Sequence, residues 1–190
     1  MKILFLADLH IKYPKKVPKD WQYNRFMLLV KEINNIECDM VILGGDTLDS
    51  AKPTTSELEL FFDFLAQIRH RTLIFSGNHE MQTKTHSILT DLKGEITRCN
   101  PNIEVVTTCT FTSPHTGEPI FDVIDYCDIN KHIEPKAKIA FTHVRGSIEP
   151  HVKPEVDLTK FKEYRYVFAG DLHSFQNSQL NIVYPGSPLS

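Results

Sequence analysis

Short apolar runs alternate with amphipathic segments along the first half of the chain. The runs at residues 3–7, 40–43 and 72–75 have the length of strands and are continuously hydrophobic, which is typical of strands covered on both faces. Between the first two runs lies an apolar stripe with helical spacing, made of Phe26, Leu29, Val30 and Ile33. The order strand, helix, strand predicts a parallel sheet joined by right-handed crossovers.

A second helix is expected between the second and third strands. Thr54 and Glu57 have the spacing of a capping box, a sequence signature of a helix start. The apolar stripe that follows consists of Leu58, Phe61, Phe62 and Leu65. The first half therefore has the order β-α-β-α-β.

The second half of the chain has a less regular pattern. We expect a short helix from His86 to Leu92, closed by Gly94. Two strands follow, separated by a turn rich in Thr, Ser, Pro and Gly at 112–119, and three more strands come later. These five strands are expected at 103–107, 120–124, 138–142, 166–169 and 181–184.

The bulk composition is that of an ordinary globular protein. With 190 residues, the chain suits one domain spanning 1–190 that buries a core without disulfides. The four cysteines form no C-x-x-C pair, so we expect reduced thiols in a cytoplasmic protein. No signal peptide or membrane-spanning run is apparent. The net charge of −3 argues only weakly against a nucleic-acid partner, because bound metal can neutralise several Asp residues.

Five of the expected strands end in side chains that can bind a metal. Each has an ordinary explanation as a turn residue, a helix cap or a buried strand-end histidine, but their joint occurrence favours a shared site. Carboxyl ends of parallel strands are where open α/β sheets bind ligands, and carboxylate, imidazole and amide oxygen together suit Mn²⁺, Fe²⁺, Zn²⁺ or Mg²⁺. The groups are Asp8 and His10, Asp46, Asn78 and His79, His143, and Asp171 and His173.

The motifs D-x-H, G-G-D, G-N-H-E, T-H and G-x-x-H occur in the order found in calcineurin-like metallophosphoesterases, which the chain resembles from Asp8 to His173. Within that superfamily it is most similar to the SbcD-type nuclease subunit of SbcCD DNA repair complexes and its phage relatives. The segment from Tyr184 to Pro188 resembles the strand and turn that follow the last motif in that group. The resemblance implies an α/β fold of four layers, α/β/β/α, with its site at the carboxyl ends of the strands.

The resemblance also implies two divalent metal ions, most simply Mn²⁺, and a role for each motif residue. His79 would contact the phosphate and help to protonate the leaving oxygen. Asp171 departs from the pattern, because the family usually has a histidine there. One ion would be held by Asp8, His10 and His173, the other by Asn78, His143 and Asp171, and Asp46 would bridge the two.

Other polar residues allow more than one interpretation. Glu80 fits the first turn of a helix better than a partner of the metal ligands. Lys12, Lys15 and Lys16 lie in a loop after the first motif and are candidates for phosphate contacts, as is Arg145, although solvated loop charges explain them equally well. The remaining histidines are expected on the surface or in loops and are His70, His86, His115, His132 and His151.

The resulting expectation is a metal-dependent DNA nuclease that cuts phosphodiester bonds in DNA repair, recombination or replication. By resemblance alone it would work with an SbcC-like, SMC-type ATPase, and a homodimer is suggested by analogy. A compact phosphodiesterase or phosphatase for small phosphate esters is the main alternative, and a metal-free scaffold is a third. Because SbcD-type proteins carry further domains, the chain is expected to be either a nuclease core truncated after Ser190 or an unusually small protein.

Overall fold

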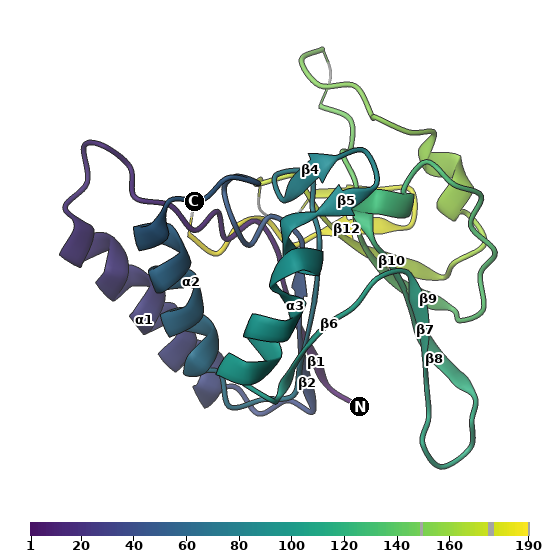
Figure 1. The fold of residues 1–190 in the computed structure, drawn as a ribbon. Helices are drawn as coiled ribbons and strands as arrows, with labels where there is room; N and C mark the ends of the chain where they lie inside the picture. The colour runs from purple at the N-terminus through teal and green to yellow at the C-terminus, as the bar shows by residue number, and fades with distance from the viewer. Residues whose placement is uncertain (149, 175–176, 190) are drawn as a thin grey trace.

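Two β-sheets lie face to face in the computed structural model, which describes residues 1–148, 150–174 and 177–189 (Figure 1). The first sheet has four strands, and all of its neighbouring strands are parallel. The predicted parallel arrangement of the first half is therefore confirmed. In spatial order the strands are β1 (Ile3–Leu6), β2 (Met40–Gly44), β3 (Thr72–Phe75) and β6 (Ile103–Val105).

The second sheet has six strands, with a parallel centre and an antiparallel strand at each edge. The turn predicted at 112–119 joins β7 to β8, whereas the strand predicted just before it belongs to the first sheet. The edge strand β7 was not predicted, because its alternating Thr residues give no continuous apolar run. In spatial order the strands are β11 (Asn177–Gln179), β12 (Ile182–Tyr184), β10 (Tyr166–Gly170), β9 (Ile139–His143), β8 (Pro119–Ile124) and β7 (Cys109–Thr112).

Alternation of side chains along the strands explains how the two sheets pack. In β2, Val41 and Leu43 point to the helical side, whereas Met40 and Ile42 point to the other sheet. Aromatic and aliphatic side chains pack between the sheets, including the stacked pair Phe141 and Phe168, whose centroids are 5.4 Å apart. Both faces of the central strands are thus buried, as their continuous apolar runs predict.

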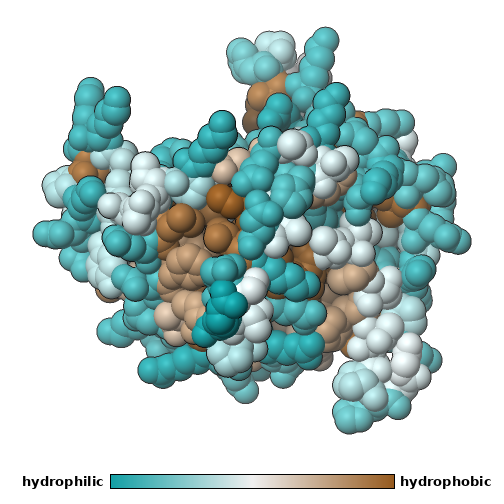
Figure 2. Space-filling view, viewed as in Figure 1, coloured by the Kyte–Doolittle hydropathy of each residue, from teal (hydrophilic) through white to brown (hydrophobic). Residues whose placement is uncertain are grey.

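Three α-helices cover the outer face of the first sheet: α1 (Lys19–Asn35), α2 (Thr55–Ala66) and α3 (Ile88–Cys99) (Figure 1). The capping box of Thr54 and Glu57 is present at the start of α2. The buried side chains of α2 are Leu60, Phe61, Phe64 and Leu65, so the predicted stripe is rotated, and Leu58 and Phe62 are only partly buried. On this side of the molecule an apolar area is visible over α2 and α3, bordered by polar side chains (Figure 2).

The helix predicted from His86 to Leu92 is wrong at both ends. His86 and Ser87 form the short strand β5, which pairs with β4 (Met81–Thr83), and Ser87 caps α3 by accepting a hydrogen bond from the amide of Leu89. The helix then continues through Gly94 to Cys99. Packing of its apolar face outweighs the roughly 0.5–1 kcal/mol that an internal glycine costs.

The outer face of the second sheet is covered mainly by irregular segments. Two short 3₁₀ helices, η1 (Tyr126–Asp128) and η2 (Leu158–Phe161), lie in these segments, and Phe161 and Tyr164 are buried in the cluster beneath. The predicted sandwich of two sheets is confirmed, and in the described residues its fourth layer contains no α-helix. No described helix is long and apolar enough to cross a membrane.

Candidate metal centre

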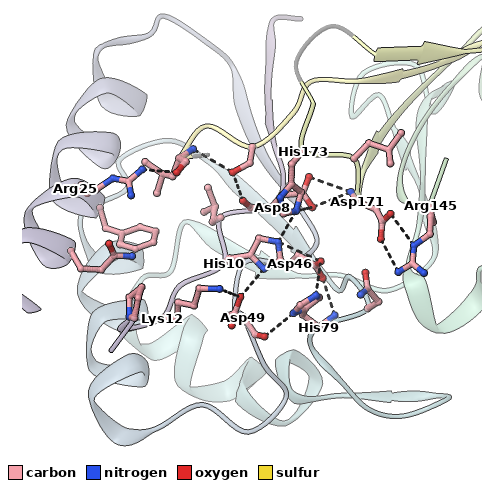
Figure 3. A pocket seen from close by; sticks show the side chains of 18 of the residues that line it. Asp8, His10, Lys12, Arg25, Asp46, Asp49, His79, Arg145, Asp171 and His173 are labelled. Atoms are coloured by element: carbon pink, nitrogen blue, oxygen red, sulfur yellow. Dashed lines mark hydrogen bonds and ion pairs between the residues drawn. The ribbon is translucent and has the colours of Figure 1, made fainter. Parts of the chain in front are cut away.

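The loops that follow β1, β2, β3, β9 and β10 meet at one edge of the sandwich. They bring together all eight residues that were predicted for the metal and phosphate site, and seven of them line one cavity of about 590 Å³. Figure 3 shows His10, Asp46 and His79 facing one another from separate loops, with Asp171 and Arg145 on the far side. The seven that line the cavity are Asp8, His10, Asp46, Asn78, His79, Asp171 and His173, whereas His143 lies behind and is fully buried.

Four of these residues have backbone conformations that L-amino acids seldom adopt. Asp8, His10, Asp46 and Asp171 have φ values of 58°, 48°, 50° and 95°. Asp and His tolerate the left-handed region better than most residues do, but it still carries a cost of order 1–3 kcal/mol. The turns that carry the polar side chains are therefore strained, which is typical of functional sites.

Glycines in the motifs are needed for close approach to the ligating side chains. Gly45 has a φ of 87°, and a Cβ placed there would collide with the imidazole of His143. A Cβ at Gly77 would collide with the carboxylate of Asp46. Glycine at 45 therefore allows the loop after β2 to approach His143, and glycine at 77 allows the loop after β3 to approach Asp46.

The Asp46 carboxylate is at the centre of the cluster. Its Oδ2 is 3.3 Å from Nε2 of His143, 3.8 Å from Nε2 of His10 and 3.9 Å from Nε2 of His79. The other oxygen, Oδ1, accepts a hydrogen bond of 2.9 Å from the backbone N–H of His79. Asp46 is 2% exposed, and although burial opposes its charge, His143 and the amide hydrogen bond lower its pKa.

The orientation of His143 is set by a backbone carbonyl. Its Nδ1 is 3.0 Å from the oxygen of Gly44, and because a carbonyl only accepts, Nδ1 carries the proton of the neutral ring. Nε2 is then directed at Oδ1 of Asn78, 3.0 Å away, and at Asp46. Burial disfavours the charged ring, but Asp46 and the other carboxylates raise the pKa of His143.

These contacts fit a bound cation better than an empty polar cluster. Nε2 of His143 lies 3.0 Å from Oδ1 of Asn78, and the Nε2 atoms of His10 and His173 are also 3.0 Å apart. Ligands about 2.1 Å from one ion lie roughly 3.0–3.4 Å apart when they are neighbours in its coordination shell. Burial lowers the pKa of His10 to about 4, which keeps that ring neutral and able to coordinate at pH 7.

Three groups of acidic and histidine side chains have atoms close enough to share an ion, counting only the described residues. Asp8, His10 and Asp46 each belong to two of the three groups, so the groups adjoin one another. The cluster can therefore hold divalent metal, and its oxygen and nitrogen donors do not single out one element. The groups are Asp8 with His10 and His173, His10 with Asp46 and His79, and Asp8 with Asp46 and His143.

His79 points into the cavity with one nitrogen fixed by hydrogen bonding. Its Nδ1 is 2.7 Å from the carbonyl oxygen of Asp49, so Nδ1–H donates to that oxygen and Nε2 faces the cavity. The side chain is 39% exposed. His79 also lines an adjoining shallower hollow of about 450 Å³, together with Lys52 and Gln82. It thus lies between two spaces that a substrate can enter.

Glu80 is not the first residue of a helix, which corrects the interpretation favoured from the sequence. It is fully buried and lies in the turn that leads into β4. Its Oε2 accepts hydrogen bonds from the amides of Gly77 (2.9 Å) and Asp46 (3.0 Å), and its Oε1 accepts one of 2.7 Å from Leu48. Burial raises the pKa of Glu80, but three donors and no acceptor fit only the ionised form. Glu80 therefore ties the loop after β3 to the loop after β2.

Asp171 lies at the site, but its carboxylate is directed at Arg145. Arg145 Nε is 3.3 Å from Oδ2 and Nη2 is 3.5 Å from Oδ1, whereas Nε2 of His143 is 4.0 Å from Oδ1. The backbone amide of Asp171 donates to both oxygens of Asp8 at 3.0 and 3.2 Å. Asp171 is thus connected to the cluster through its backbone and to Arg145 through its side chain (Figure 3).

The four basic candidates differ in position. Lys12 and Arg145 line the cavity, and Nζ of Lys12 is 2.7 Å from Oδ1 of Asp49. Lys15 and Lys16 are exposed in the same loop and do not line it. Asp49 and Arg25 also line the cavity, and neither was predicted from the sequence as a site residue. Asp49 follows Asp46 by three residues in one turn, which is the only local signal for it.

The remaining histidines do not contribute to this cavity. His86, His115, His132 and His151 are exposed, as predicted, and His70 is partly buried at the end opposite the site. His86 pairs with Asp91 at 2.7 Å. None of these five lines the cavity in the described part of the chain.

The fold and the clustered strand-end ligands agree with a match to a family profile. The profile of the calcineurin-like phosphoesterases matches residues 1–175. The chain belongs to this family, as the sequence motifs indicate.

Individual relatives of the chain include an exonuclease subunit and a DNA repair protein. The chain is 47% identical to the probable exonuclease subunit 1 of Escherichia phage T5, over all of its own length and 60% of that protein. It is 30% identical to the DNA double-strand break repair protein Mre11 of Nanoarchaeum equitans, over 41% of this chain and 23% of the relative. The chain therefore spans less than two thirds of the relatives it matches.

Solved structures support the fold. The protein TT1561 of Thermus thermophilus superposes with a TM-score of 0.59 at 14% identity, covering 97% of this chain and 88% of that one. A novel archaeal phosphodiesterase superposes with a TM-score of 0.51 at 13% identity, over 98% and 84% of the two chains. At such identities the likeness concerns the architecture alone.

Proposed function

We propose that this chain is a divalent-metal-dependent DNA nuclease that hydrolyses phosphodiester bonds at the strand-end cluster. The observation that carries the proposal is the geometry around Asp46, whose carboxylate lies within 4 Å of three imidazole nitrogens from different loops. The likeness to a phage exonuclease subunit along the entire chain supports DNA as the substrate.

The residues proposed to hold metal are those with acceptor atoms directed at one another. Asp8, His10 and His173 form one group, Asn78 and His143 form the other, and Asp46 lies between them. Bound divalent cations supply charge to polarise a phosphate and lower the pKa of the attacking water. Two ions, with Mn²⁺ as the first choice, suit this donor set.

His79 is proposed to act on the leaving group. Hydrolysis breaks the bond between phosphorus and the leaving oxygen, adds the hydroxyl of water to phosphorus and transfers a proton to the leaving oxygen. With Nδ1–H donated to the carbonyl of Asp49, Nε2 is the atom that can deliver this proton. The amide of His79, bound to Asp46, keeps the ring next to the reacting phosphate.

Buried partners keep these groups in place before substrate binds. Glu80 fixes the amides of Asp46 and Gly77, and the Gly44 carbonyl fixes the ring of His143. Fixed dipoles and charges need no reorganisation during the reaction, which is a large source of rate enhancement. The cavity of about 590 Å³ and the adjoining hollow leave room for nucleotides on both sides of the scissile phosphate.

The partner is also part of the proposal. The phage relative is named as a subunit of an exonuclease, which supports action together with a second protein. An SMC-type ATPase of the SbcC kind is the partner we propose, and a homodimer is consistent with it.

The test compares substrates directly. Purified protein with Mn²⁺ is incubated with labelled duplex and single-stranded DNA, and in parallel with bis(p-nitrophenyl) phosphate and nucleotides. We expect DNA cleavage that stops when EDTA is added. Rapid hydrolysis of the small esters with DNA left intact would contradict the nuclease proposal and favour the alternative, a phosphodiesterase for small substrates.

A pair of histidine variants tests the role of His79. His79→Asn is expected to lower turnover by roughly 10²–10⁴-fold, because general acid catalysis is lost, with Mn²⁺ binding retained. His86→Asn is the matched control, since His86 is exposed and outside the cavity. Full activity in His79→Asn would refute the assigned role.

A further inference from the structure

Arg145 is held at the wall of the cavity by contacts to its side chain and to its backbone. Its side chain pairs with both oxygens of Asp171, at 3.3 and 3.5 Å. Its backbone N–H donates to Oε1 of Glu155 at 3.0 Å, and the hydroxyl of Tyr126 donates to the other oxygen of Glu155 at 2.6 Å. Glu155 therefore fixes the main chain of Arg145 while Asp171 fixes its guanidinium.

The strand register explains why Arg145 and Asp171 are neighbours. β9 and β10 are parallel, and His143 at the end of β9 pairs with Gly170 at the end of β10. The residues that follow, Arg145 and Asp171, therefore leave the sheet side by side. The loop beyond Arg145 is held as well, because the side-chain amide of Gln179 binds both the N–H (2.7 Å) and the carbonyl (2.6 Å) of Ser147.

The Asp171 carboxylate is closer to the guanidinium of Arg145 than to the imidazole of His143. Nε2 of His143 is 3.0 Å from Asn78 and 3.3 Å from Asp46. The Asp171 carboxylate is 4.0 Å from the same nitrogen of His143. Asp171 also belongs to none of the three candidate ligand groups found among the described residues.

We propose that Asp171 is a positioning residue, which holds the Arg145 guanidinium against the cavity so that Arg145 binds a phosphate of the substrate. The inference rests on the proposed phosphodiester chemistry and names a substrate contact within it. A guanidinium has five N–H donors, so it can pair with Asp171 and still bind phosphate oxygens. The Arg145 side chain is 41% exposed and lines the cavity, whereas Asp171 is 9% exposed beneath it.

In this arrangement the chain has an arginine-binding aspartate where its family usually has a metal-binding histidine. Residue 171 does not supply a neutral imidazole nitrogen to the second ion. Its carboxylate instead orients the guanidinium of Arg145. Arginine recognises phosphate through paired N–H groups, which restricts the orientation of the phosphate as well as its charge.

The experiment uses three variants of the intact chain: Arg145→Gln, Asp171→Asn and the two combined. Asn is chosen because residue 171 has a φ of 95°, which Asn tolerates. Arg98→Gln is the control, since Arg98 forms a similar ion pair with Glu95 (2.6 Å) on the exposed surface of α3. Calorimetry counts the Mn²⁺ ions bound per chain and then measures the affinity of the Mn²⁺-loaded protein for inorganic phosphate.

We expect Asp171→Asn and Arg145→Gln to bind as many Mn²⁺ ions as the unaltered chain. Arg145→Gln should weaken phosphate binding roughly tenfold or more, as expected for loss of a charged hydrogen bond, and Arg98→Gln should not. The effect of Arg145→Gln should be much smaller in the Asp171→Asn background, because an arginine without its anchor contributes less.

Three results would overturn the inference. One is the loss of a bound Mn²⁺ in Asp171→Asn but not in Arg145→Gln, which would make Asp171 a ligand. The others are an unchanged phosphate affinity in Arg145→Gln, or an equal effect of that change in both backgrounds. None of these measurements needs turnover, so they are separate from the DNA cleavage assay that decides the proposed function.

Discussion

Replacing Glu80 by Gln tests whether one buried carboxylate joins the loops that build the site. The two side chains have nearly the same shape, but Gln presents one oxygen and one NH₂ group. The Gln oxygen can still accept the hydrogen bonds from the amides of Asp46 and Gly77. The Gln NH₂ group then takes the place of Oε1, which in the unaltered chain accepts a hydrogen bond of 2.7 Å from the N–H of Leu48. The N–H of Leu48 and the NH₂ group are then two buried donors that face each other without an acceptor.

The magnitude follows from these contacts. An unsatisfied buried donor costs about 1–3 kcal/mol, and two hydrogen bonds to a charged group become neutral ones, at about 1 kcal/mol each. Relief of the repulsion between Glu80 and Asp46 and of the buried charge offsets part of this cost. We expect Glu80→Gln to lower the free energy of unfolding by about 2–4 kcal/mol, a large share of the 5–15 kcal/mol typical of a domain.

Urea denaturation of the metal-free protein measures this change through the midpoint of unfolding. Calorimetry with Mn²⁺ provides a second measurement, because the loop that carries Asp46 loses its hydrogen bond at Leu48 and metal affinity should fall with stability. Glu118→Gln is the control, since Glu118 is exposed in the turn between β7 and β8 and should change stability by less than about 0.5 kcal/mol. An unchanged midpoint in Glu80→Gln would refute the reasoning.

Three further predictions concern the centre and its supports. Mn²⁺ at about 100 times its Kd should stabilise the chain by about 2.7 kcal/mol, seen as a higher Tm, and Asp46→Asn should abolish both this shift and DNA cleavage. Gly45→Ala should cost about 1–3 kcal/mol in thermal unfolding and weaken Mn²⁺ binding, because the new Cβ collides with His143 at a positive φ; normal binding would contradict this. Burial opposes the charge of Glu57, but hydrogen bonds, first from the amide of Thr54, hold its pKa below 4.5. The stabilisation of the folded state by the Glu57 carboxylate is therefore present above pH 4.5. It is lost as the pH falls through the lower pKa that Glu57 has in the folded state. Glu57→Gln should cost roughly 0.5–2 kcal/mol at pH 7 and progressively less as the pH falls through the folded pKa, and an equal cost at every pH would contradict it.

The sequence was most informative where local pattern and chemistry coincide. Continuous apolar runs can be only buried strands or helices, and the runs before Asp8, Asp46 and Asn78 are too short for helices. Parallel strands place their carboxyl ends at one edge, so the gathering of these side chains could be predicted. Their closeness is observed here, whereas their roles as metal ligands are proposed.

Features that depend on contacts between distant segments could not be predicted. Glu80 follows a turn, and from sequence an acid in that position resembles a helix start. Its burial depends on the loop after β2, more than 30 residues away. The pairing of Arg145 with Asp171 similarly depends on the register between β9 and β10. The strand β7 was missed because an edge strand needs no apolar run.

Both sheets contribute to the cluster, and this affects how the protein is made. Asp8, Asp46 and Asn78 follow strands of the first sheet, whereas His143 ends a strand of the second sheet and His173 follows another. The hydroxyl of Ser187, nearly at the end of the described chain, donates to the carbonyl of Asp8 at 2.7 Å. A ribosome translates the first sheet early, but the growing polypeptide has no complete cluster until His173 has emerged. A site built in this way cannot carry out the proposed hydrolysis of DNA before the second sheet has been translated.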